Sequence, residues 1–187
     1  DVYYTAQPGG SCHLYRWSIS GTTPGSVTHT DLGATAGGVD LTYYASAVDH
    51  TRNRIVYWRG IGEFGSASTT AHVYDITAGT WSTITITGPA AATITNGGNY
   101  QAMQYSAVTD SFYTRLRAES GGAAYAISAG SLVATAISTT GGSGIEADVT
   151  GPMNRFVLTP ELIPGSSIGG VFYMPTHTSL VRFLRLH

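Results

Sequence analysis

A strand–turn–strand segment recurs along this chain of 187 residues. Its clearest copy, Ala71 to Trp81, reads Ala-His-Val-Tyr-Asp-Ile-Thr-Ala-Gly-Thr-Trp. Valine and tyrosine favour an extended strand. The carboxylate of Asp75 can accept hydrogen bonds from the following backbone amides, and Gly79 can take a positive φ without steric cost. We therefore predict a strand to Ile76, a tight turn over 77–79 and a second strand from Trp81.

Three other segments match this one at intervals of about 50 residues. Each carries a tyrosine within a short apolar strand, and the four tyrosines are Tyr15, Tyr74, Tyr125 and Tyr173. An apolar strand precedes each of them, within 2–5, 53–58, 110–115 and 154–158. Ahead of the last three lies one further strand, within 41–48, 100–108 and 144–149. The repeat therefore predicts units of four short antiparallel strands, the first unit lacking its innermost strand.

Four-stranded sheets at a period of 40 to 50 residues are typical of a β-propeller. We predict an all-β chain holding about four blades of four antiparallel strands, with the first blade incomplete. The predicted blades span approximately 1–38, 39–96, 97–142 and 143–187. The chain is then a single propeller domain or the C-terminal part of a larger propeller, and a closed four-bladed ring is the alternative. Upstream sequence or another chain would complete the first blade.

The segment from Val73 to Trp81 resembles the kelch repeat, in which a Tyr-Asp pair, a turn and a tryptophan close each blade. The pairs Gly121-Gly122 and Gly169-Gly170 match the double glycine of that repeat. The resemblance implies a kelch-like, galactose-oxidase-like propeller fold. A fold of this kind hosts many functions, so the resemblance does not name an activity.

The composition favours strands and excludes several classes of function. Charged residues make up 11% of the chain, against about 25% in an average domain, and all nine basic residues are arginine. Because binding to phosphate backbones requires a basic patch, we expect no nucleic-acid partner. No apolar run is long enough for a membrane helix, so we expect no membrane partner. The alanine-rich stretch at 89–93 is short and is flanked by glycine or proline, and we expect no helix there.

No cofactor or metal ligand set is expected from the sequence. The six histidines show no ligand spacing, and the single cysteine, Cys12, cannot form an intrachain disulfide. We expect Cys12 to be a small buried apolar residue. A galactose-oxidase-like copper site would need a Cys–Tyr cross-link, and the residues around Cys12 do not provide the rest of that site.

The loops that join the second and third strands carry the candidates for a site. Three of them hold or adjoin a glutamate, Glu63, Glu119 and Glu161, and a glycosidase needs two converging carboxylates. The simpler interpretation is that these glutamates are solvated loop residues. Arg59, Glu63 and Phe64 share one glycine-rich loop and are our candidate binding residues, whereas no catalytic residue is assigned. Most aromatic side chains are expected to pack between blades.

The favoured hypothesis is a non-enzymatic structural or binding propeller of a virion or an extracellular recognition assembly, with a protein or carbohydrate partner. The general character of the sequence is similar to that of propeller domains in tailed-phage virions. Two alternatives stay open: a carbohydrate-active enzyme or copper oxidase on the same fold, and a protein-interaction module like cellular kelch domains.

Overall fold

The computed structural model describes ten segments of the chain, and all structural statements below refer to them. They are residues 1–6, 11–20, 26–35, 45–58, 68–96, 102–116, 123–140, 156–159, 170–173 and 182–186.

The described chain is all-β with one short helix, which confirms the predicted class. Its fifteen strands are β1 (Val2–Ala6), β2 (His13–Ile19), β3 (Val27–Ala34), β4 (Ala45–Asp49), β5 (Arg54–Trp58), β6 (Thr70–Asp75), β7 (Thr80–Thr85), β8 (Ala102–Ser106), β9 (Ser111–Arg115), β10 (Ala124–Ser128), β11 (Ala134–Ile137), β12 (Thr139–Thr140), β13 (Phe156–Thr159), β14 (Gly170–Tyr173) and β15 (Arg182–Leu186). Every pairing between these strands is antiparallel.

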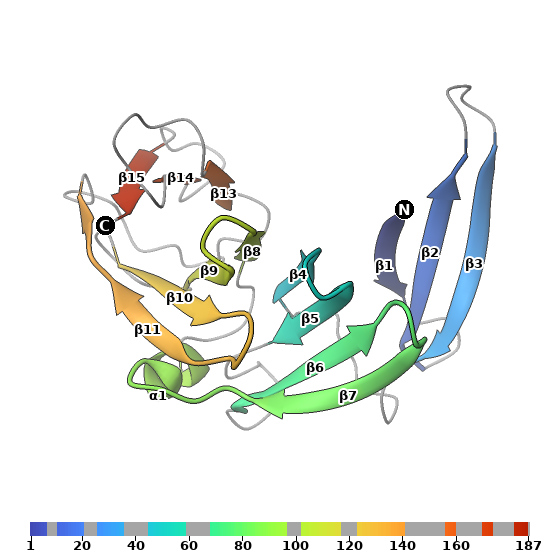
Figure 1. Ribbon diagram of the computed structural model, residues 1–187, viewed down its shortest axis with the longest axis horizontal. Coiled ribbons are helices and arrows are strands. Elements are labelled where there is room, and N and C mark those ends of the chain that lie inside the picture. Colours follow the sequence, from blue (N-terminus) through green and yellow to red (C-terminus); the bar gives the residue numbers. More distant parts are fainter. Residues whose placement is uncertain are drawn as a thin grey trace.

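The strands form one three-stranded sheet and three four-stranded sheets. Their orders are β1-β2-β3, β4-β5-β6-β7, β8-β9-β10-β11 and β13-β14-β15-β12. We call them the first to the fourth sheet in this order. Figure 1 shows them following one another along an arc, with β1, β4 and β8 on its inner side and β3, β7 and β11 on its outer side. The arc is open between the first and fourth sheets.

The hairpin over residues 71–81 has the predicted geometry. Asp75 Oδ1 accepts a hydrogen bond from the backbone amide of Ala78 at 2.8 Å, and Gly79 has a φ of 67°. The strand ahead of the turn ends at Asp75 and the next begins at Thr80. Trp81 pairs with Tyr74 across the hairpin, with ring centroids 5.1 Å apart. The local turn chemistry therefore sets the register of β6 against β7.

A first apolar cluster joins the first sheet to the second. The first sheet contributes Leu14, which is fully buried, together with Cys12 and the half-buried Tyr3 and Leu32. The second sheet contributes an aromatic-rich face formed by Ile55, Tyr57, Tyr74 and Trp81. Cys12 is 1% exposed, so it is the buried apolar residue that was predicted.

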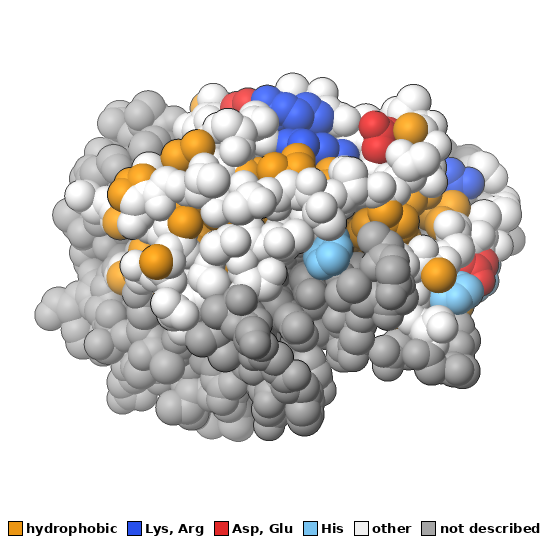
Figure 2. Space-filling model, turned by 90° about the horizontal axis from the view of Figure 1, so that it is seen from below, with side chains coloured by type: hydrophobic (Ala, Val, Ile, Leu, Met, Phe, Trp, Pro, Cys, Tyr) orange, Lys and Arg blue, Asp and Glu red, His pale blue; other side chains and the backbone are white. Residues whose placement is uncertain are grey.

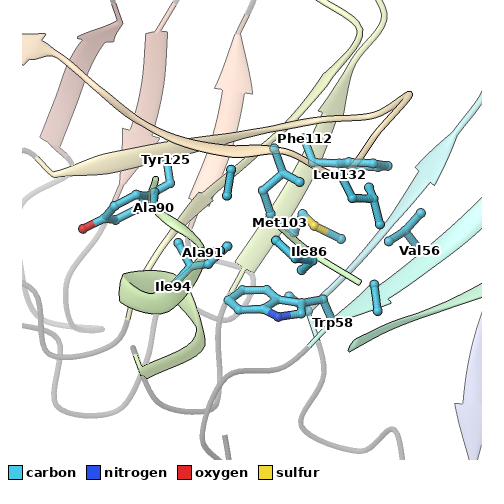
Figure 3. Packing of buried hydrophobic residues seen from close by; sticks show 14 of the residues in the cluster. Val56, Trp58, Ile86, Ala90, Ala91, Ile94, Met103, Phe112, Tyr125 and Leu132 are labelled. Atoms are coloured by element: carbon cyan, nitrogen blue, oxygen red, sulfur yellow. The ribbon is translucent and has the colours of Figure 1, made fainter. Parts of the chain in front are cut away.

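A larger cluster joins the second sheet to the third (Figure 3). Val56, Val73 and the fully buried Trp58 face it from the second sheet, while Phe112 and Ile127 face it from the third. The aromatic residues Tyr57, Tyr74, Tyr113 and Tyr125 are all buried, as expected for packing residues. Phe156 and Tyr173 were given the same role, and their side chains lie outside the described part of the structure.

The expectation that no helix forms in the alanine-rich stretch was wrong. Residues Ala91–Asn96 form α1, which packs against the second cluster through Ala91 and the fully buried Ile94. Figure 3 shows Ile94 beside Trp58. A helix this short is marginal in isolation, so burial of its apolar side stabilises it, and local propensity alone was a poor guide.

The end of the third sheet reaches into the fourth. β11 pairs with β10, and only Ser138 separates it from β12, which pairs with β15. This continuous extended segment belongs to two sheets, an arrangement that the sequence did not indicate. The strand expected within 144–149 lies outside the described residues.

Candidate functional site

The residues predicted to form a binding loop are not in the described part of the chain. Arg59, Glu63 and Phe64 all lie in 59–67, and Glu119 and Glu161 also fall outside the described segments. Their roles stay predictions. The features that stand out among the described residues are a sheet face, an inner cavity and a cluster of ion pairs.

One face of the first sheet is rich in aromatic residues and largely exposed, with Tyr15 buried at its centre. We call it the outer face. Because side chains alternate along a strand, the register places the following residues on it together: Val2, Tyr4, His13, Tyr15, Trp17, Ile19, Val27, His29 and Asp31. The opposite face holds Leu14 and Leu32 and packs on the second sheet. The sheet is therefore buried on one side only.

The outer face exposes large apolar side chains of types that are usually buried. Trp17 is 46% exposed, and Ile19 and Val27 are 62% and 52% exposed. Val2, at 49%, lies opposite Trp17 across β1 and β2. Contiguous apolar surface of this kind marks an interaction site more often than scattered apolar residues do.

Ring stacking organises the centre of the outer face. Tyr4, Tyr15 and His29 come from the three different strands and lie nearly parallel. The Tyr4 and Tyr15 centroids are 5.2 Å apart at 19°, and those of Tyr15 and His29 are 5.2 Å apart at 16°. Trp17 tilts against Tyr4 with centroids 5.2 Å apart. The rings thus form one preorganised surface across the sheet.

The polar groups of this face are paired with one another. The Tyr4 hydroxyl and His29 Nε2 are 2.7 Å apart, and His13 Nδ1 lies 3.0 Å from Asp31 Oδ2. Asp31 Oδ1 also accepts a hydrogen bond from the Gly33 amide at 2.8 Å. That backbone hydrogen bond, followed by the contact with His13, lowers the pKa of the Asp31 carboxyl. Desolvation, then the nearby Asp31 charge, raises the pKa of the Tyr15 hydroxyl.

A cavity of about 520 Å³ lies on the inner side of the arc. Its lining comes from Asp1 and the start of β1, from β4, β5 and His50, and from β8. Polar lining side chains include Ser46, His50, Gln104 and Tyr105. Within the described residues, no strand pairs with the free edge of β1. The cavity therefore lies where β1 approaches the innermost strands of the next two sheets.

The ion pairs at the turns connect the second sheet to the third. Arg52 binds Asp110 through both terminal nitrogens and also contacts the buried Asp49. Arg54 contacts Asp49 as well and donates to the backbone carbonyl of Ala129. Every charge here has a partner within the cluster, which gives it a structural role.

Across the described segments, no three His, Cys, Asp or Glu side chains gather in a way that could hold a metal ion. The one described helix is too short to cross a membrane. Figure 2 shows a surface with few charged side chains, on which arginine and acidic residues lie near one another.

No family model matches the chain, and no curated protein matches it. The kelch-like resemblance therefore stays a prediction.

The outer face was missed in the sequence analysis, although a signal was present. Apolar or aromatic residues alternate through Tyr15, Trp17 and Ile19, and Val27 and His29 continue the pattern on the next strand. Alternation of this kind predicts one shared face. It does not say whether that face is covered, because that depends on which sheets lie on either side.

Proposed function

We propose that the chain is a non-enzymatic structural or binding protein of the β-propeller type, a component of a virion or an extracellular recognition assembly. The observation that carries this proposal is the arc of sheets, which leaves an aromatic face uncovered at the first sheet. A surface of this chemistry is suited to lasting contact with a further protein surface.

A kelch-like propeller with about four blades in this chain accounts for the arrangement. The inner strands β4 and β8 lie toward the centre of the arc, and successive sheets bury their faces on one another. In this interpretation the first blade is incomplete. The free edge of β1 and the cavity beside it support completion by a strand from upstream sequence or from another chain, since an exposed edge offers unpaired backbone groups.

The main alternative is a carbohydrate-active hydrolase, and an activity assay separates the two. We expect the purified chain to release no reducing sugar from a panel of polysaccharides. The matched control replaces the three loop glutamates together, Glu63→Gln, Glu119→Gln and Glu161→Gln. Sugar release that this triple variant loses would contradict the proposal, because hydrolysis by paired carboxylates would then be established.

A further inference from the structure

We propose that the outer face of the first sheet is the docking surface for a further β-sheet of the same polypeptide. This sheet would precede the first sheet in chain order and present mainly aliphatic side chains. The inference rests on the proposed function, because it extends the arc of sheets by one neighbour.

The two interfaces between sheets in the described chain have the same arrangement of aromatic and aliphatic residues. At the first, aromatic residues of the second sheet, such as Tyr74, pack on Leu14 and Leu32 of the sheet before it. At the second, Phe112 of the third sheet packs on Val56 and Val73 of the sheet before it. In each case the later sheet gives the face richer in aromatic rings: Tyr57, Tyr74 and Trp81 against Tyr3 at the first interface, and Tyr105, Phe112 and Tyr125 against Trp58 at the second.

The outer face is the corresponding aromatic face of the first sheet. Tyr15 on β2 occupies the side of its sheet that Tyr74 on β6 occupies in the second sheet, turned away from the sheet that follows. By continuity with the two interfaces, its partner is a mainly aliphatic face of a sheet that comes earlier. Figure 1 shows that the arc is open on this side of the first sheet.

The polar groups of the outer face favour a sheet over a sugar. Tyr4 is paired with His29, and His13 is paired with Asp31. Covering these groups therefore leaves few hydrogen bonds unmade, which is the condition for burying polar atoms against an apolar surface. A sugar would need free donors and acceptors, and these internal pairs already occupy polar atoms of Tyr4, His29, His13 and Asp31.

The size of the face favours a tethered partner over a second copy. Three strands about 4.8 Å apart and seven residues at about 3.4 Å each give a projected area of roughly 350 Å². A stable interface between separate proteins buries about 800 Å² on each partner. A covalent connection relaxes this requirement, because it raises the effective concentration of the partner to the millimolar range.

Trp17 provides a direct readout, because the other two tryptophans are more buried. Trp58 is fully buried and Trp81 is packed against Tyr57 and Tyr74. The experiment measures the intact mass of the polypeptide from its native source and the quenching of its tryptophan fluorescence by acrylamide. It compares that polypeptide with the 187-residue chain, each with and without Trp17→Phe.

We expect a native polypeptide longer than this chain, in which Trp17→Phe leaves quenching unchanged because Trp17 is covered. In the 187-residue chain, the same substitution should remove the readily quenched component. Two results would overturn the proposal: a native mass near 19.6 kDa, or a longer polypeptide in which Trp17 is quenched as in the short chain. A native chain of this mass that forms a dimer protecting Trp17 would assign the face to a second copy instead. None of these results alters the sugar-release assay, so the two proposals fail separately.

Discussion

Arg52 and Asp110 join two neighbouring sheets through a bidentate ion pair, with nitrogen–oxygen distances of 2.7 and 2.6 Å. Arg52 lies in the turn between β4 and β5, and Asp110 lies in the turn between β8 and β9. The Tyr105 hydroxyl donates to the same carboxylate at 2.9 Å. The contact thus fixes one turn against the other at the end of the second apolar cluster.

Removing the charge of Arg52 should destabilise the chain. In Arg52→Met, Asp110 loses its bidentate partner, and the buried Asp49 keeps Arg54 as its charged partner and the backbone amide of residue 52. We expect the melting temperature to fall by a few degrees, because the pair is partly exposed and solvent reduces its strength. Thermal unfolding followed by circular dichroism measures this. Arg16→Met is the control, since Arg16 makes no ion pair among the described residues; an equal loss in both variants would contradict a specific role for Arg52.

The same pair should contribute to stability against acid. Hydrogen bonds from Arg52, and then from Tyr105, lower the pKa of Asp110 to about 2, below the value near 3.9 of an unfolded aspartate. A lowered pKa in the folded state gives stability that is present above about pH 4 and is lost as the pH falls toward about 2. We therefore expect Asp110→Asn to be less stable than the wild type at pH 7, and the difference to shrink over that range.

Urea titrations at several pH values measure that difference. Asparagine is a suitable replacement because residue 110 has a φ of 46°, a conformation that asparagine tolerates. A difference that stays constant down to pH 2 would show that the Asp110 charge contributes nothing.

Gly88 should not tolerate a side chain. It has a φ of 98°, and a Cβ atom there would lie 2.7 Å from the Ala134 carbonyl oxygen and 2.8 Å from Val133 Cγ1. We expect Gly88→Ala to cost at least about 3 kcal/mol, through backbone strain plus displacement of Val133 and the start of β11. Gly33 is a matched control, because its φ is 92° but nothing lies within 4 Å of its Cβ position. Gly33→Ala should cost only about 1–2 kcal/mol for the backbone conformation. Equal losses in urea-induced unfolding would mean that the close contacts at Gly88 are not important.

Truncating the core between the second and third sheets should be costly. Phe112 is fully buried in the second apolar cluster. We expect Phe112→Ala to lower the free energy of unfolding by about 3–5 kcal/mol, since it removes apolar contacts and leaves a cavity. Val108→Ala is the control: Val108 is 63% exposed, and its change should stay within about 0.5 kcal/mol. A small effect at Phe112 in equilibrium unfolding would mean that the two sheets do not share a core.

Much of the local structure followed from the sequence because it depends on contacts within a few residues. The turn between Asp75 and Gly79 is one example, and the alternation that places Tyr57 and Tyr74 in the interior is another. By contrast, α1 depends on Ile94 reaching a core built by distant strands, so no local pattern indicates it.

A tripeptide that occurs twice in the sequence does not occupy equivalent positions in the structure. Ser-Ala-Val occurs at both 46–48 and 106–108. Ser46 lies inside β4 opposite Tyr57, whereas Ser106 ends β8 opposite Ser111. The matching letters therefore occupy different places in their hairpins, because the register is set by turn geometry and by which side chains must be buried. The candidate site was harder still to predict, since exposure of Trp17 depends on the arrangement of whole sheets.

Because β11 and β12 form one extended segment, the third and fourth sheets should not unfold independently, although each is a separate repeat. A repeat array whose members touch only through their faces can open one member at a time. Here, Ala134–Ile137 pairs with β10 while Thr139–Thr140 pairs with β15, so opening the fourth sheet releases a strand that continues directly from the third. These two sheets should therefore exchange their backbone amide protons together, and dividing the chain near residue 142 would separate β15 from β12.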